Sequence, residues 1–299
     1  MAAPEMRPMS IGDILDTTFR QYRTRFVPFL LITMMVYVPF GLVMAGIQTS
    51  LRFAQPGPFG QPGGQRVRVW MVALNQSPPP VVLAQAPGGQ FDPNAPVGPP
   101  NLAALIPLMV GSLIFFLVLW PLCQGALVQN ISAAYLGGEL GAWESYSRAL
   151  PRIFRMLITQ FLAGIVIMLG CFLLIVPAII FGLWFTLIVP VVMLEKHGIT
   201  GTLGRSRELM RGNLGKAFRL GMVVAIMGMV VNYGWAFTSA AIPWPHPFLQ
   251  HFLGTIVPAV ILPIQIAPTI LLYYDIRIRK EGFDLERLAA ALGVGPALA

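Results

Sequence analysis

Residues 156–194 read MLITQFLAGIVIMLGCFLLIVPAIIFGLWFTLIVPVVML, a run of 39 residues without a charged side chain. A single α-helix of that length would measure about 58 Å, whereas the hydrocarbon core of a bilayer is about 30 Å thick. The run must therefore fold back on itself. Pro177 lacks a backbone N–H and disfavours helix in the residue before it, so the turn of a membrane hairpin is predicted near this proline. We expect two spans, at about 155–174 and 177–194.

The composition of the whole chain supports a membrane location for this hairpin. Of its 299 residues, 56% are hydrophobic and only 11% are charged. An average soluble domain has about 25% charged residues, and it needs that polar surface to face water. The formal net charge is +8 at pH 7. Its basic residues form short clusters beside apolar runs, a pattern that fits anionic lipid headgroups and membrane topology better than nucleic acid.

Three further charge-free runs extend the pattern, and the last of them, 220–274, is long enough for two helices. The proline-rich segment AAIPWPHPFLQ at 240–250 separates these two. The spans predicted from these runs are about 26–48, 102–128, 216–239 and 248–273. The fold class is therefore all-α, a polytopic membrane bundle of six transmembrane helices in a single domain, 1–299. Prolines inside the spans predict kinked rather than broken helices, because neighbouring groups can satisfy the freed carbonyls.

The distribution of Lys and Arg predicts the orientation. With six spans both termini lie on one side, and that side holds 17 of the 20 Lys and Arg residues. Its segments are 1–25, 129–155, 195–219 and 275–299. The positive-inside rule then places both termini in the cytoplasm. The long segment on the other side, 52–101, is rich in Pro and Gly, which predicts a disordered extracytoplasmic loop.

Short amphipathic segments precede the odd-numbered spans on the cytoplasmic side. In the first, 10–26, Ser10 can cap a helix and Asp13 suits its first turn. Shifts of 129 and 188 residues align comparable segments before the third and fifth spans. We interpret the pattern as a threefold repeat of interfacial helix plus membrane hairpin, with chance similarity among basic amphipathic segments as the alternative. Another short amphipathic helix is expected at 281–293.

Two groups of residues are candidates for function. A basic cluster between the fourth and fifth spans could bind the phosphates of anionic lipid headgroups, and charges that only set topology are the alternative. Its members are Arg205, Arg207, Arg211, Lys216 and Arg219. The second group consists of amides inside the spans, namely Gln124, Gln160, Asn232 and Gln265. Hydrogen bonds between helices are one explanation for these amides, and a polar substrate pathway is the other.

No catalytic constellation is recognisable in the sequence. It contains no H-E-x-x-H, P-loop or G-x-S-x-G motif, and the predicted spans hold essentially no ionisable residue. Cys123 and Cys171 both lie in apolar runs, without the further ligands that a zinc site or a disulfide framework needs. We therefore expect no enzymatic activity, no cofactor and no metal. The expected partner is the lipid bilayer itself.

Three segments together resemble one bacterial family. They are RPMSIGDILDTTFRQYRTRF at 7–26, LLIVPAIIFGLWFTLIVPVVMLEKHGITGTLGRSRELMRGN at 173–213 and LLYYDIRIRKEGFDLE at 271–286. This arrangement is similar to the multi-pass glycerophosphoryl diester phosphodiesterase membrane domain, and the similarity covers nearly the whole chain except 52–101. Relatives often carry Pro-Gly where this chain has Pro177-Ala178, so a less sharp hairpin turn is expected.

The same resemblance bears on activity. In some relatives this membrane domain is fused to a catalytic barrel, which would need over 200 further residues with acidic metal ligands and paired histidines. We expect that barrel to be absent here, so the resemblance implies a stand-alone membrane module with no catalytic residues to carry over. The leading hypothesis is a scaffold or accessory domain that contacts anionic lipid. The alternative is a transporter or permease subunit, with a polar cavity at mid-membrane lined by Gln124, Asn232 or Gln265.

The orientation can be tested with a reporter enzyme that is active only outside the cytoplasm. Fused to either terminus it is expected to stay inactive, because the Lys and Arg residues of that side hold it in the cytoplasm. The same reporter inserted within 52–101 is expected to be active. Activity of a terminal fusion would contradict the predicted orientation.

Overall fold

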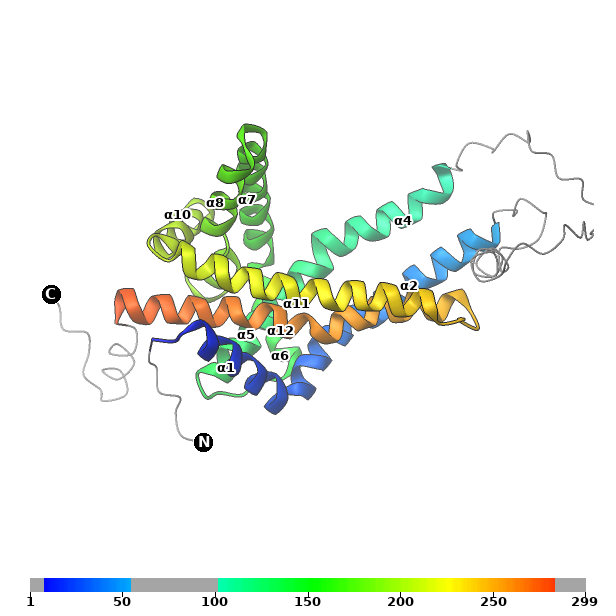
Figure 1. Ribbon diagram of the computed structural model, residues 1–299, viewed down its shortest axis with the longest axis horizontal. Helices are drawn as coiled ribbons and strands as arrows, with labels where there is room; N and C mark the ends of the chain where they lie inside the picture. Colours follow the sequence, from blue (N-terminus) through cyan, green and yellow to red (C-terminus); the bar gives the residue numbers. More distant parts are fainter. Residues whose placement is uncertain (1–7, 55–101, 283–299) are drawn as a thin grey trace, which may run out of the picture.

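The computed structural model describes residues 8–54 and 102–282, and over these ranges the chain is helical with short connections (Figure 1). Six helical segments are long and apolar enough to cross a membrane. They are Phe26–Ser50, Ile106–Tyr135, Ala142–Phe172, Ile175–Leu194, Leu214–Ala241 and Pro247–Glu281. The predicted all-α fold with six membrane helices is confirmed. Most of the predicted loop at 52–101 and of the predicted helix at 281–293 lies outside the described residues.

The N-terminal amphipathic helix is α1 (Ile11–Thr24), which begins with the capping interaction expected of Ser10. The Ser10 hydroxyl accepts a hydrogen bond from the Asp13 backbone N–H at 3.2 Å, and the Asp13 carboxylate accepts one from the Ser10 N–H at 2.8 Å. This reciprocal pair satisfies two N–H groups that the start of a helix leaves without partners. After Arg25 the chain continues as α2 (Phe26–Ala54), which contains the first membrane span.

The second span consists of α4 (Leu102–Ile114), the π-helix Phe115–Leu119 and α5 (Trp120–Tyr135). The π-helix lies just before Pro121, which cannot donate a hydrogen bond to the carbonyl four residues earlier. In the widened turn the Trp120 N–H bonds to the Phe115 carbonyl, five residues back. Pro121 therefore bends the span without ending it.

The charge-free run 156–194 folds back as a hairpin. α6 (Ala142–Ala149) continues through a 3-10 turn at 150–152 into α7 (Ile153–Leu173), and the extended residue Leu174 separates α7 from α8 (Ile175–Trp184). Pro177 lies in the first turn of α8, where a backbone N–H has no helical partner to lose. In Figure 1 the hairpin of α7 and α8 projects away from the long axis of the neighbouring helices.

The prediction of kinked rather than broken helices is wrong at one place, in the fourth span. α8 is followed by a turn at 185–187 and then by α9 (Ile188–Leu194). Pro190 lies in the first turn of α9 and cannot donate to the Thr186 carbonyl, so the helix is interrupted here. Because α8 alone is only about 15 Å long, α8 and α9 together are needed to form this span.

The last two spans run side by side along the long axis of the molecule (Figure 1). α10 (Ile199–Met210) is followed by Gly212, whose left-handed φ of 85° turns the chain into α11 (Leu214–Ala241). α12 (Pro247–Glu281) stays helical through Pro258, Pro263 and Pro268. The short helices α1 and α10 precede the first and fifth spans, and the short helix α6 forms the start of the third. We call the end of the bundle that holds these three helices and the last turns of α12 the charged end.

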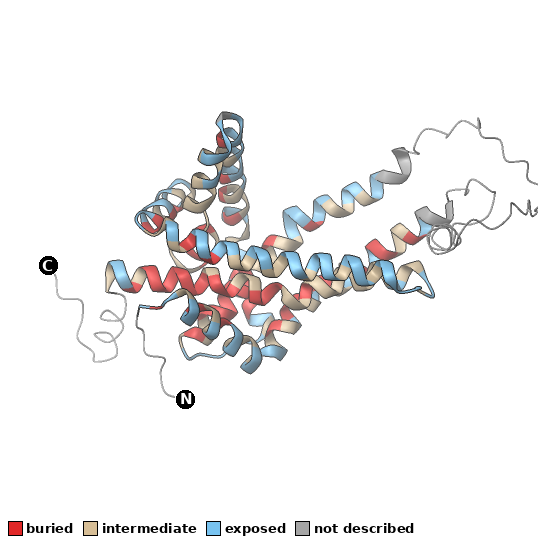
Figure 2. Cartoon of the chain, in the orientation of Figure 1, coloured by how far each residue is buried: buried red, intermediate tan, exposed pale blue. Residues whose placement is uncertain are grey.

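α12 is the central helix of the bundle. In its apolar segment 50% of the residues are buried, against 11% in α11, and Figure 2 shows buried residues concentrated along it. Large apolar side chains on the outer faces of other spans lie 70–80% exposed, among them Met109, Phe172 and Phe237. Soluble proteins rarely expose apolar surface so extensively, whereas lipid tails are as apolar as these side chains. The outer faces of the bundle are therefore suited to lipid contact.

The two arms of the hairpin pack closely at Gly170 on α7. A Cβ atom at this position would lie 2.8 Å from the Phe181 ring and 3.1 Å from the Ala178 backbone. We expect Gly170→Ala to lower the free energy of unfolding by about 1–3 kcal/mol, the usual cost of overpacking. Chemical denaturation in detergent measures this change.

The matched control is Gly164→Ala on the same helix, because no atom lies within 4 Å of that Cβ position. This variant is expected to be unchanged or slightly more stable, since Ala favours helix over Gly. A Gly170 variant as stable as the Gly164 variant would contradict the close packing of the hairpin.

Candidate functional site: the charged end and an intramembrane cavity

A buried carboxylate anchors the charged end. Asp275 of α12 is fully buried and accepts hydrogen bonds from the Met9 backbone N–H at 2.6 Å and from Lys216 Nζ at 2.5 Å. Arg279 Nε lies 3.1 Å from the same carboxylate. The Met9 carbonyl in turn accepts hydrogen bonds from Lys216 and Arg279, at 2.5 Å and 3.0 Å. These contacts join the start of α1 to α11 and α12, and they satisfy a charge that would be costly to bury alone.

A second ionic cluster surrounds Glu195, the residue that follows α9. Its carboxylate accepts hydrogen bonds from the Tyr273 hydroxyl at 2.8 Å and from Arg205 Nε at 3.0 Å. Arg205 also bonds to Glu281, whose carboxylate accepts a hydrogen bond from Arg277 at 2.9 Å. Burial lowers the pKa of Arg205, but the hydrogen bonds and charges of Glu281 and Glu195 outweigh this effect and raise the pKa above its ordinary value. The cluster ties α10 and the end of α9 to α12.

The five basic residues of the predicted headgroup cluster divide into two sets. Arg205 and Lys216 are occupied by the internal contacts just described, with 18% and 15% of their side chains exposed. Arg207, Arg211 and Arg219 are exposed, and none of these three has an acidic partner within 4 Å in the described part of the chain. Only the exposed three are therefore available to an external anion.

The interrupted fourth span is held in place by side chains from neighbouring helices. The Ser206 hydroxyl donates to the carbonyl of Trp184, the last residue of α8, at 2.6 Å. Near the end of α9, the Met193 carbonyl accepts hydrogen bonds from Gln129 at 2.8 Å and from Arg152. The last carbonyls of a helix have no hydrogen-bond partner within that helix, and these side chains provide the missing donors. The end of α8 just before the break at 185–187 and the far end of α9 are therefore both fixed by neighbouring helices.

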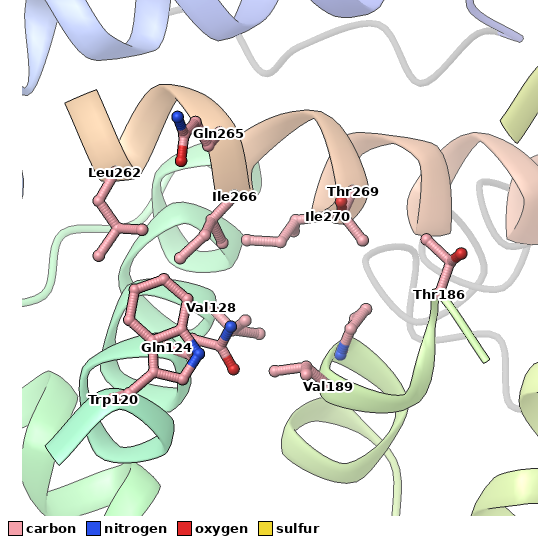
Figure 3. A pocket seen from close by; sticks show the side chains of 11 residues that line it. Trp120, Gln124, Val128, Thr186, Val189, Leu262, Gln265, Ile266, Thr269 and Ile270 are labelled. Carbon is pink, nitrogen blue, oxygen red and sulfur yellow. The ribbon is translucent and has the colours of Figure 1, made fainter. Parts of the chain in front are cut away.

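This break borders a cavity of about 260 Å³ between α5, the fourth span and α12 (Figure 3). Its lining residues are Trp120, Gln124, Val128, Thr186, Val189, Pro190, Leu262, Gln265, Ile266, Thr269 and Ile270. Each contributing helix has a proline in or beside the stretch that lines the cavity: Pro121, Pro190, Pro263 and Pro268. Prolines bend or interrupt helices, and bends in neighbouring helices at one level favour a gap between them.

The four intramembrane amides have different surroundings. Gln160 of α7 donates a hydrogen bond to Gln124 Oε1 of α5 at 3.2 Å, which links two helices as expected. Gln124 and Gln265 line the cavity. Asn232 is exposed on α11 and donates to the Gly228 carbonyl of its own helix at 2.8 Å. Of the three amides predicted to line a polar pathway, the structure therefore brings together Gln124 and Gln265 but not Asn232.

Sequence reasoning missed Asp275 and the two hydroxyls of the cavity, Thr186 and Thr269. Asp275 carried a signal, because it is the first charge after the run 220–274 and so stands where the last span leaves the hydrocarbon. The threonines carried none, since a Thr inside a helix commonly bonds to its own backbone. Thr186 does so, donating to the Gly182 carbonyl at 3.1 Å. Only the packing of three helices places these hydroxyls beside one cavity.

Comparison with known proteins gives no match among family models, curated proteins or solved structures. The resemblance to the glycerophosphoryl diester phosphodiesterase membrane domain therefore stays a prediction from the sequence. Within residues 8–54 and 102–282, no group of three or more His, Cys, Asp or Glu side chains could hold a metal ion. The charged end and the cavity are the features of the described structure from which a function can be inferred.

The anchoring role of Asp275 can be tested with Asp275→Asn, which keeps the size of the side chain but removes its charge. Lys216 and Arg279 would then lose their carboxylate partner, and breaking a buried ion pair costs about 3–5 kcal/mol. We expect a loss near the lower figure, because Arg279 is 43% exposed. Unfolding of the purified protein in detergent measures it.

Asp16→Asn is the control, because Asp16 is exposed on α1. An exposed substitution of this kind is expected to change stability by at most about 0.5 kcal/mol. Equal stability of the two variants would show that the Asp275 cluster does not anchor the charged end.

Proposed function

We propose that the chain is a non-catalytic, multi-pass protein of a bacterial plasma membrane that acts as a scaffold or accessory domain and binds anionic lipid headgroups at its charged end. The observation that carries this proposal is that neighbouring basic residues differ in exposure and in ion pairing. Arg205 and Lys216 serve the internal ionic clusters, whereas Arg207, Arg211 and Arg219 are exposed without an acidic partner within 4 Å in the described residues. Guanidinium groups left in this state are suited to phosphate oxygens.

The positions of these arginines along the chain favour headgroup contact. Arg211 caps the end of α10, and α11 enters the bundle at Leu214. Arg219 is therefore only about 8 Å along the axis of a membrane helix from its start. A long arginine side chain at that depth can extend its charged group to the headgroup region. Arg207 lies over the Trp184 ring, 4.4 Å from its centre, and both residue types are common at membrane interfaces.

Lipid selectivity tests the proposal. The full chain is reconstituted with spin-labelled phosphatidylglycerol or spin-labelled phosphatidylcholine, and the fraction of each lipid at the protein surface is measured by electron paramagnetic resonance. The natural chain is expected to prefer the anionic lipid, and the triple variant Arg207→Gln, Arg211→Gln, Arg219→Gln is expected to lose most of that preference. Each cation near a membrane surface contributes about 1 kcal/mol of attraction.

A charge-matched control separates a local site from overall charge. Arg20, Arg23 and Lys196 are also exposed, and their replacement by Gln removes the same formal charge elsewhere. The control variant is expected to keep most of the preference for phosphatidylglycerol. If both triple variants lost the preference for phosphatidylglycerol equally, lipid binding by Arg207, Arg211 and Arg219 would be contradicted.

A transporter or permease subunit is the second candidate, and the cavity between α5, the fourth span and α12 favours it. Two predicted amides line this cavity, and one of its walls is an interrupted helix, a feature of many transporter binding sites. Its volume of about 260 Å³ is at or below the lower limit for small-molecule sites, about 300–1,000 Å³. The cavity is thus suited to a small group rather than to a large polar solute.

A further inference from the structure

The walls of the cavity define the chemistry that it could hold. Seven of its eleven lining residues are apolar, and the other four, Gln124, Thr186, Gln265 and Thr269, are polar but uncharged. A charged ligand would lack a counter-charge here, and burying an unpaired charge in hydrocarbon is very costly. A wholly apolar ligand would leave the NH₂ group of Gln124 without a partner. The walls therefore match a neutral, hydrogen-bonding group attached to an apolar body.

The depth of the cavity favours entry from the bilayer. Gln265 precedes Asp275 by ten residues on α12, which places it about 15 Å along the helix from the charged end. This level lies inside the hydrocarbon core, which is about 30 Å thick. Trp120, Thr186 and Ile266 are among the lining residues that are only partly buried, so the cavity reaches the surface of the bundle. A molecule dissolved in the membrane could reach it there.

The hydrogen-bonding groups favour a ligand that accepts. The oxygen of the Gln124 amide is used by Gln160, at 3.2 Å. Its NH₂ group has no protein partner in the described structure, and two hydroxyls, those of Thr186 and Thr269, line the same space (Figure 3). Amide N–H groups donate only, while hydroxyls donate or accept. The Thr186 hydroxyl already donates to the Gly182 carbonyl and can only accept, whereas the Gln124 NH₂ group and the Thr269 hydroxyl would complement a hydroxyl, carbonyl or ester oxygen.

We propose that this cavity is a binding site for the neutral, oxygen-bearing head of a membrane-dissolved amphiphile. The neutral head would accept hydrogen bonds from the Gln124 amide and the Thr269 hydroxyl, and a hydroxyl head could also donate to the Thr186 oxygen. Its apolar chain would leave between the helices into the lipid. None of the exposed arginines of the charged end lines this site, so it can be tested independently of the proposed headgroup contact.

Protection of a cysteine placed in the cavity tests the proposal. Thr186→Cys is made in a Cys171→Ser background, because Cys171 is exposed, while Cys123 is buried and can remain. The full chain in nanodiscs is alkylated with N-ethylmaleimide in the presence of 1-dodecanol, dodecane or dodecyl sulfate, and the modified residue is identified by mass spectrometry. These three probes share a twelve-carbon chain and differ in the head alone.

Dodecanol is expected to slow alkylation at residue 186 about fivefold more than dodecane, the effect of one neutral hydrogen bond. Dodecyl sulfate is expected to protect no better than dodecane. Adding Gln124→Leu is expected to reduce protection by dodecanol to the dodecane level. Asn232→Leu is the control, because it removes an intramembrane amide that does not line the cavity, and protection should be unchanged.

Thr269→Val, which removes a hydroxyl at nearly constant shape, serves as the second variant if Gln124→Leu does not fold. Equal protection by dodecanol and dodecane would overturn the proposal, and so would equal protection by dodecyl sulfate. Protection by dodecanol that survives loss of the Gln124 amide, or of the Thr269 hydroxyl, would also refute the assigned contacts.

Discussion

The hydrocarbon core of a bilayer offers no hydrogen-bond partner to a peptide group, and the rest of this structure follows from that constraint. The spans are helices because a helix satisfies its backbone internally. Some backbone carbonyls also accept a hydrogen bond from another helix: the Tyr22 hydroxyl donates to the Val260 carbonyl at 2.9 Å, and the Tyr146 hydroxyl donates to the Ile32 carbonyl at 2.6 Å. Polar side chains within the bundle thus join helices through the backbone as well as through one another.

Charged side chains that lie next to the hydrocarbon also need partners within the protein, and the charged end provides them. Asp275 and Glu195 lie where spans leave the hydrocarbon, and each is surrounded by donors from other helices. The two clusters connect α1, α10, α11 and α12 and the end of α9, which are distant in sequence. Arg205 and Lys216 are paired within these clusters, whereas Arg207, Arg211 and Arg219 stay exposed at the surface. Exposed arginines at a charged end joined in this way suit the proposed contact with anionic lipid.

The cavity arises from the cost of prolines in membrane helices. Pro121 is accommodated by a π-helix, Pro190 by a break in the fourth span, and Pro263 and Pro268 within a continuous α12. The three helical segments that contain these prolines surround the cavity, where their side chains do not fill the space between them. The space is bordered by uncharged polar groups, because a charged one would have no partner at this depth. The unfilled space and its uncharged polar walls are both consistent with the proposed site for a neutral head and an apolar chain.

The lengths of the charge-free runs determined the class of fold, since about 20 apolar residues are needed to cross a bilayer and a run of 39 must turn back. Ser10 and Asp13 likewise determined the start of α1, because capping depends on neighbours in sequence. The break before Pro190 was not predictable, since a proline permits either a kink or an interruption and packing selects one. Only the tertiary structure decided that Lys216 serves Asp275 while Arg219 stays exposed, because partners 59 residues apart meet through helix packing and not through spacing.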